Sequence, residues 1–219
     1  MPALFTFEHV VVEAGGRRIL DGVDATVADH GITALAGPSG SGKSTLLRLC
    51  NRLEVVVEGR VLFRGDDVAE LDPLSLRRRV GMVFQRPTLF PGTVRENLAV
   101  AAPAVDEATY GDVLERVALG REFLDRVADD LSGGEAQRAC LARTLVTGPE
   151  VLLMDEVTSS LDRANESVLE RLARQLADDG VPVLWVSHDI AQIGRMADAT
   201  IELDEGRVVR RSDPREHPA

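Results

Sequence analysis

The sequence predicts an α/β fold built around a parallel sheet, and three observations support that prediction. A glycine-rich loop joins a short apolar strand at residues 32–36 to a helix at residues 44–53. Three further runs are almost continuously apolar, as expected of strands covered on both faces: residues 80–84, 151–154 and 183–186. Between residues 85 and 131 the apolar residues follow helical spacing instead.

The individual elements follow in order along the chain. Residues 4–12, 22–27 and 60–63 are expected to form a small antiparallel layer, because Gly and Asp turns separate them. The helix at residues 44–53 has four leucines available for packing: Leu46, Leu47, Leu49 and Leu53. The region between residues 85 and 131 has an apolar helix face of its own: Val113, Leu114, Val117 and Ala118. A helix begins near Gly134 and stops before Gly148, and another follows Asp162.

Charge and composition exclude several classes of protein. The net charge is −11 and the pI is about 4.9, so no basic stripe is available to bind nucleic acid. The triplet at residues 77–79 is interpreted as a solvated helix face. No apolar run approaches the ~20 residues that span a bilayer, and no signal peptide is evident, so we expect an intracellular protein. Cys50 and Cys140 are expected to be free, buried thiols.

The glycine-rich loop is the most specific motif in the chain. Lys43 is the only lysine, against 24 arginines, and it lies in a run that matches the phosphate-binding pattern G-x-x-x-x-G-K-[ST]: Gly37, Pro38, Ser39, Gly40, Ser41, Gly42, Lys43, Ser44 and Thr45. A compact ammonium fits between two phosphates better than a forked guanidinium does. The alternative is a Gly/Ser-rich surface loop, but strand, loop and helix is the context the motif needs. The sequence therefore predicts binding of a nucleoside triphosphate.

Four shorter segments could complete such a site, although each has an ordinary structural interpretation. Asp155 and Glu156 end an apolar strand, where carboxylates suit Mg²⁺ chemistry or simply a polar strand end. Residues 131–135 are a second glycine-rich turn that opens a helix, either an anion site or a helix start capped by Ser132. Gln85 and His188 follow strands, where they could reach a metal, a water or a phosphate, or serve structure alone.

In order and spacing, these segments together resemble the ATP-binding-cassette (ABC) ATPases over essentially the whole chain. The resemblance implies an α/β fold with a P-loop NTPase (RecA-like) core, an antiparallel β subdomain and an inserted α-helical subdomain. It also implies that residues 1–219 form a single nucleotide-binding domain. Residues 1–86 and 145–219 would form the catalytic core with the β subdomain, and residues 87–144 would form the helical subdomain that carries the signature.

The same resemblance implies a composite site in an ATP-dependent, head-to-tail homodimer. ATP would lie between the phosphate loop of one subunit and the signature residues of the other, Ser132, Gly133 and Gly134. Mg²⁺ would be held by Ser44 and, through water, Asp155, with Gln85 contacting metal and water. Glu156 would polarise the attacking water and His188 would touch the γ-phosphate. Asp162 would communicate across the interface.

Two positions depart from the family pattern. Ala14 stands where members commonly place a tyrosine that stacks on adenine, so adenine recognition is in doubt; Phe7 and His9 are the nearest substitutes. Val157 replaces the usual proline after the catalytic glutamate, and little change in the placement of Glu156 is expected, since both residues favour extended backbone.

The resemblance also suggests what the protein works with. Residues 85–98 are similar to the transporter form of the region that receives a separate transmembrane permease, which would place the chain in the cytoplasm, peripheral on the inner face of the cell membrane. Residues 87–90, 155–162 and 183–189 look most like the ATPase of the bacterial iron-export (Fet-type) system. Residues 51–53 and 77–80 favour the alternative, a phosphate-import ATPase. A soluble ABC ATPase of iron–sulfur assembly remains a third interpretation.

Overall fold

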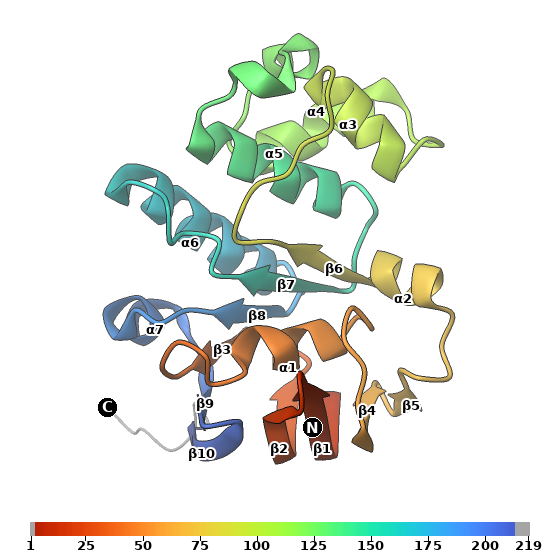
Figure 1. Cartoon of the computed structure of the whole chain (residues 1–219). Helices are drawn as coiled ribbons and strands as arrows, with labels where there is room; N and C mark the ends of the chain where they lie inside the picture. The colour runs from red at the N-terminus through yellow and green to blue at the C-terminus, as the bar shows by residue number, and fades with distance from the viewer. Residues whose placement is uncertain (1–2, 213–219) are drawn as a thin grey trace.

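The computed structural model describes residues 3–212, and within them the strands form two sheets (Figure 1). The first sheet is antiparallel and has four strands in the order β2-β1-β4-β5: β2 (Arg17–Ala28), β1 (Ala3–Ala14), β4 (Glu58–Phe63) and β5 (Asp66–Asp67). The second has six strands in the order β10-β9-β3-β8-β7-β6: β10 (Arg207–Ser212), β9 (Ala199–Asp204), β3 (Ile32–Ala36), β8 (Val183–Val186), β7 (Val151–Asp155) and β6 (Val80–Val83). In this sheet only the β10–β9 pair is antiparallel among the described residues.

The central strands of the six-stranded sheet are buried on both faces, as their apolar composition predicts. All five residues of β7 are buried. Leu152 and Met154 belong to the core on one side of the sheet, and Val151 and Leu153 to the core on the other. This alternation places every second side chain of the strand on the same face.

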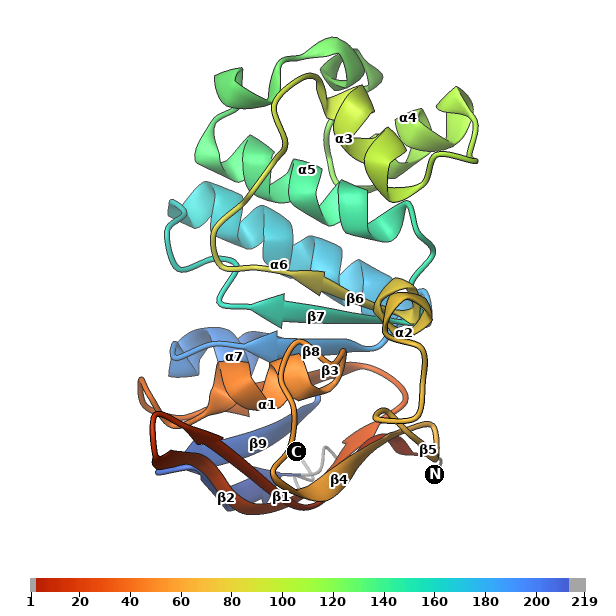
Figure 2. The same ribbon diagram turned by 45° about the vertical axis from the view of Figure 1, so that its right-hand side comes forward.

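The helices form layers on either side of that sheet. Helix α1 (Lys43–Leu49) lies between the two sheets, and Leu46 and Leu47 are fully buried there (Figure 2). Helix α6 (Arg163–Asp178) packs on the opposite face, and α3 (Val94–Ala101), α4 (Glu107–Arg116) and α5 (Gly133–Leu145) lie beyond it (Figures 1 and 2). The other helices are α2 (Pro73–Arg79) and α7 (Ile190–Met196), and there are short 3₁₀ turns η1 (Arg121–Asp125) and η2 (Ala128–Asp130).

Side-chain caps set the starts of helices α2 to α7, and two of these caps are residues singled out from the sequence. At α5, the Ser132 hydroxyl accepts a hydrogen bond from the Glu135 backbone N–H, and the Glu135 carboxylate accepts one from the Ser132 N–H. This reciprocal arrangement satisfies two donors that a helix otherwise leaves unpaired. At α6, the Asp162 carboxylate accepts from the Asn165 backbone N–H.

Several boundaries differ from the sequence prediction. Helix α1 ends at Leu49 rather than at residue 53, because Arg52 takes a left-handed conformation with φ of 56°, and Leu53 is 42% exposed. Ala118 also has a positive φ, 56°, and is exposed after the end of α4, so it does not extend the buried face. Phe84 lies outside β6 and is 46% exposed.

One strand starts earlier than predicted, and several elements had no counterpart in the sequence prediction. β2 begins five residues earlier than expected, at Arg17, because the tight turn at residues 15–16 pairs Arg17 with Ala14. Strands β5, β9 and β10 and helix α7 were not expected, and helix α2 was expected only at the arginine triplet, residues 77–79.

The arginine triplet at the end of α2 does more than face solvent. Arg77 donates to the backbone carbonyls of Asn51 and Arg52. Arg79 donates to Glu150 and lies over the Phe63 ring, 4.7 Å from its centroid. The prediction of a solvated face holds for Arg77, which is exposed, and was wrong for Arg79, which is half-buried against Phe63.

Both cysteines are free and buried, as expected, and burial raises the pKa of each thiol. Within residues 3–212, no helix combines the length and the apolar character that crossing a membrane requires.

Candidate active site

The parallel strands bring the predicted site residues to one edge of the six-stranded sheet. β3 is followed by the glycine-rich loop, β6 by Gln85, β7 by Glu156 and β8 by His188. The register aligns these ends, because Val186 pairs with both Leu35 and Asp155. The carboxyl edge of a parallel sheet is where ligands bind in open α/β folds.

The loop needs glycine at two positions for reasons visible in its packing. Gly37 has φ of 132°, and a Cβ there would lie 2.0 Å from the carbonyl oxygen of Leu203. Gly42 has φ of 100°, and its Cβ would lie 2.6 Å from the Leu20 side chain and 2.9 Å from the Ile19 carbonyl oxygen. The loop therefore takes a backbone path that side chains would prevent.

Lys43 is held inside this loop. Its Nζ donates to the carbonyl oxygens of Gly37 at 2.9 Å and Pro38 at 2.7 Å, and the residue is buried. Burial lowers the pKa of Lys43, while the carboxylates of Glu156 and Asp155 act in the opposite sense. An ammonium has three donors, so one remains for an anion. The buried Ser41 hydroxyl has no hydrogen-bond partner within residues 3–212, which also suits a phosphate-binding loop.

A hydroxyl and a carboxylate converge beside the loop. The Ser44 Oγ donates to Asp155 Oδ1 at 2.7 Å, and Arg48 donates to Asp155 Oδ2 at 3.2 Å. Asp155 is buried, and the positive charge of Arg48 offsets the cost of burying the Asp155 carboxylate. Oxygen ligands of this kind suit Mg²⁺, which usually retains several waters and uses few protein ligands. Ser44 and Asp155 therefore fit a magnesium site.

Glu156 is the point where the other polar residues meet. Gln85 Nε2 lies 3.3 Å from Glu156 Oε2 and donates to the Ser159 hydroxyl at 3.1 Å. His188 Nδ1 lies 3.7 Å from Glu156 Oε1. Glu156 itself has φ of 47°, a strained conformation for a residue with a side chain, of the kind that clusters at functional sites. The structure brings Gln85 to Glu156 rather than to Asp155.

The signature residues lie at the start of α5, and their contacts within residues 3–212 are not with the Lys43 loop. The side-chain hydrogen bonds of Ser132 stay within its own capping box. Gly134 is buried against the amide of Asn165, where a Cβ would lie 2.2 Å from Oδ1. Gly133 has open space around it. Among the described residues, no hydrogen bond joins this turn to the Lys43 loop.

Asn165 joins the signature turn to the turn that ends in Asp162. Its Oδ1 accepts from Arg138 at 2.8 Å, and its Nδ2 donates to both carboxylate oxygens of Asp162 at 3.2 and 3.1 Å. Asp162, singled out from the sequence, is thereby fixed in its helix-capping position. The hydrogen bonds of its turn lower the pKa of the Asp162 carboxyl.

The structure excludes one of the two residues suggested to stack on the base in place of the missing tyrosine. Ala14 is exposed at the end of β1. Phe7 is 2% exposed and packs in the antiparallel core near Phe5, so it cannot stack on a base, and that suggestion was wrong. His9 is exposed, with φ of 48° and its ring against Gly22.

Two residues of the site were missed in the sequence. Arg48 pairs with Asp155, and its spacing of four residues from Ser44 on a helix is a signal that could have identified it. Ser159 receives the Gln85 amide, but it lies in an irregular turn where no periodicity applies.

Comparison with known proteins shows the family to which the chain belongs. The family described as ABC transporter matches residues 20–159, and the chain belongs to this family as an ATP-binding domain. It is a P-loop ATPase with the α/β fold expected from the sequence.

Individual relatives extend the similarity to most of the chain. The chain is 38% identical to "Phosphate import ATP-binding protein PstB 3" of Natronomonas pharaonis, over 94% of this chain and 80% of that protein. It is 41% identical to "ABC transporter I family member 17" of Arabidopsis thaliana, over 98% and 84%. The solved structure of cbiO1 from Clostridium perfringens, described as part of the ABC transporter complex cbiONQ, has a TM-score of 0.89 at 26% identity, over 99% of this chain and 90% of that one.

Proposed function

We propose that this chain is the Mg²⁺-dependent, ATP-hydrolysing subunit of a membrane transporter whose channel is a separate permease. The observation that carries the proposal is the convergence of Lys43, Ser44, Asp155, Glu156 and His188 at one edge of the parallel sheet. Phosphoryl transfer requires mainly positioning and charge neutralisation, and this set of side chains offers both.

Each residue has a role that follows from its chemistry. Lys43 and the loop N–H groups bind the β- and γ-phosphates. Ser44 and, through water, Asp155 would hold Mg²⁺, which would supply positive charge to neutralise the phosphates. Glu156 accepts a proton from the attacking water, while Gln85 holds the carboxylate of Glu156 and contacts the metal and water. His188, 3.7 Å from Glu156, donates to a phosphate oxygen.

The position of the signature turn supports a second part of the proposal, that ATP joins two copies of the chain head to tail. Ser132 and Gly133 are exposed at a helix N-terminus, which attracts anions, and their own subunit does not use them for its phosphate loop. The phosphates bound by the loop of one subunit would meet Ser132, Gly133 and Gly134 of the other. We further propose that residues 87–144 form a helical subdomain that moves relative to the core as this dimer closes, with Asp162 contacting the other subunit.

The cargo is set by the permease, and the comparisons favour phosphate import over iron export. Four of the relatives bear the name phosphate import ATP-binding protein, at 35 to 41% identity. An iron-export ATPase is not among the relatives described above, although the sequence pattern favoured it. One relative, from Mycolicibacterium thermoresistibile, is named a mycobactin import ATP-binding/permease protein, at 42% identity. We therefore propose phosphate import.

The exposed residues after β6 support docking of the permease on the cytoplasmic membrane face. Phe84 and Phe90 are 46% and 49% exposed on either side of Arg86. The charge reversal Arg86→Glu should weaken co-purification with a multi-span membrane protein from detergent extracts. Arg95 is a poorer site for this test, because it pairs with Asp125 and Glu107 in its own subunit.

The control is the exposed residue Arg171 on α6, reversed to Glu, which should leave co-purification unchanged. Recovery of soluble scaffold proteins alone with the wild-type chain would support the third interpretation, a soluble ATPase of iron–sulfur assembly.

A further inference from the structure

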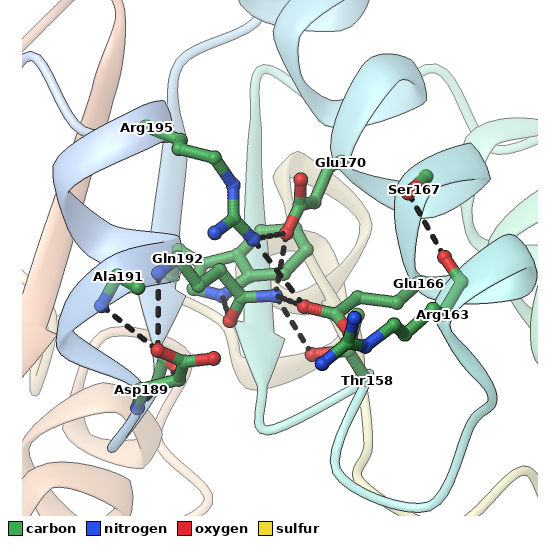
Figure 3. Close-up of polar contacts among 11 residues, drawn as sticks. Thr158, Arg163, Glu166, Ser167, Glu170, Asp189, Ala191, Gln192 and Arg195 are labelled. Carbon is green, nitrogen blue, oxygen red and sulfur yellow. Dashed lines mark hydrogen bonds and ion pairs between the residues drawn. The ribbon is translucent and has the colours of Figure 1, made fainter.

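A partly buried polar cluster adjoins the proposed catalytic residues, and the buried residue Gln192 is at its centre (Figure 3). We call it the Gln192 cluster; it consists of Thr158, Glu166, Glu170, Trp185, Gln192 and Arg195. Gln192 lies in α7 and is 2% exposed. A polar cavity of about 200 Å³ is lined by Glu156, Thr158, His188 and Gln192 among others, so the cluster and the catalytic residues share one space.

The orientation of the Gln192 amide is fixed by Trp185. The Trp185 indole Nε1 donates to Gln192 Oε1 at 3.2 Å. An indole N–H can only donate, so the amide oxygen must face the tryptophan. The amide nitrogen therefore points to the other side, toward α6 and the turn after β7 (Figure 3).

That nitrogen has more acceptors than it can satisfy. Gln192 Nε2 lies 3.1 Å from Thr158 Oγ1, 3.2 Å from Glu166 Oε1 and 3.0 Å from Glu170 Oε1. An amide nitrogen carries two hydrogens, so it serves two of these three acceptors at a time. Glu170 also receives Arg195, at 2.8 Å. Desolvation and the neighbouring Glu170 raise the pKa of Glu166.

The contact with Thr158 connects two loops of the site. Thr158 is two residues after Glu156 in the same turn. Gln192 is four residues after His188, and the Asp189 carboxylate accepts hydrogen bonds from the backbone N–H groups of Ala191 and Gln192 (Figure 3). The Thr158–Gln192 hydrogen bond therefore links the turn that carries Glu156 to the helix that follows His188.

We propose that Gln192 is a positioning residue for ATP hydrolysis: through Thr158 it holds the Glu156 turn at a fixed separation from His188. This inference rests on the proposed roles of Glu156 and His188. Gln192 touches neither the phosphates nor the water in this scheme. Its effect is on the geometry of the residues that do, and small displacements of such residues slow chemistry more than they weaken binding.

The test uses two variants that break the same hydrogen bond from opposite ends. Thr158→Val removes the hydroxyl while keeping the branched shape, and Gln192→Leu removes the amide. Each should lower kcat about tenfold, corresponding to about 1.4 kcal/mol of barrier, with KM changed less than twofold. The double variant should be no slower than the slower single variant, because both act on one interaction. Thr158→Ser should restore most of the rate.

A spectroscopic readout separates positioning from general damage. Trp185 is the only tryptophan in the chain and is bonded to Gln192, so its emission reports on the cluster. Saturating Mg²⁺-ATP should change the emission of the wild-type protein, and Thr158→Val should reduce that change. Ser167→Ala is the matched control. It removes a hydrogen bond from the Ser167 hydroxyl to the Arg163 carbonyl within α6, outside the turn that carries Glu156 and Thr158, and should alter neither kcat nor the Trp185 emission (Figure 3).

The failures of the two proposals are distinguishable. If Glu156→Gln is inactive while Thr158→Val hydrolyses ATP within twofold of the wild-type rate, the inference about Gln192 is wrong and the proposed function stands. If the effects of Thr158→Val and Gln192→Leu simply add, the two residues do not act through their shared hydrogen bond, and the inference is again overturned. If Glu156→Gln itself hydrolyses ATP at the wild-type rate, the proposed role of Glu156 fails.

Discussion

Adding one methyl group to Gly134 should destabilise the isolated subunit, whereas adding it to Gly133 should not. A Cβ on Gly134 would lie 2.2 Å from Asn165 Oδ1 and 2.3 Å from Asn165 Cγ. The amide must retreat by at least ~1.2 Å to reach ordinary van der Waals distance, which breaks its bonds to Arg138 and Asp162. The Asn165 backbone N–H keeps its bond to Asp162.

The magnitude follows from the bonds that are lost. Hydrogen bonds to charged groups contribute about 1.5–3 kcal/mol each, less where solvent reaches them, so we take about 2–3 kcal/mol for the two partners together. Replacing glycine by alanine in a helix returns about 0.5–1 kcal/mol. Gly134→Ala should therefore cost about 1–2.5 kcal/mol and lower Tm by about 2–10 °C for a chain of this size. Gly133→Ala should leave Tm unchanged or slightly raised.

Thermal and urea unfolding followed by circular dichroism measures both variants. The decisive comparison repeats Gly134→Ala in an Asn165→Ala background, where the opposing amide is absent and the cost of the methyl group should nearly disappear. Equal costs in the two backgrounds would refute the packing argument. With Mg²⁺-ATP, Gly133→Ala should weaken dimerisation although the subunit is intact, because the proposed interface covers this residue.

The remaining predictions concern the base, acid stability and the phosphate loop. With Ala14 in place of an aromatic ring, GTP should compete with ATP within about an order of magnitude, and a thousandfold preference for ATP in a competition titration would contradict this. The hydrogen bond from Arg79 lowers the pKa of Glu150, so its stabilisation is present above the ordinary carboxyl pKa of about 4.3 and is lost as pH falls through the lowered value. Glu150→Gln should therefore be less stable than wild type at pH 7, and urea titrations should show the gap closing below about pH 4; a constant gap would refute the assignment. Lys43→Ala should abolish binding of a fluorescent ATP analogue, and binding at the wild-type affinity would contradict the role assigned to Lys43.

Short-range pattern identified most strands of the six-stranded sheet and the residues that follow their carboxyl ends. The strands at residues 32–36 and 183–186 coincide with β3 and β8, because strands buried on both faces have few polar residues. The glycine pattern around Lys43 reflects a backbone path that the packing of Gly37 and Gly42 makes necessary. Strands β9 and β10 were missed. β10 has no apolar run to identify it, because it is mostly exposed and carries three arginines in its six residues.

The parts that could not be predicted depend on tertiary contact. Nothing in the sequence places Gln85 beside Ser159 or Gln192 beside Thr158, because the partners are 74 and 34 residues apart, and Ser159 and Thr158 lie in an irregular turn. Helix α1 has helical spacing to Leu53, yet it ends at Leu49, where the backbone turns through the left-handed Arg52. Phe7 is near Ala14 in sequence, but the alternation of β1 points it into the core.

The most direct test of the account is the oligomeric state of Glu156→Gln with Mg²⁺-ATP, measured by light scattering together with phosphate release. The substitution keeps the shape of the side chain and removes the charge that activates water, so ATP should bind without being hydrolysed. Because ligand that favours one state stabilises it by mass action, the population should shift to a dimer that persists. A variant that hydrolyses ATP at the wild-type rate, or that stays monomeric while saturated with ATP, would contradict the composite site.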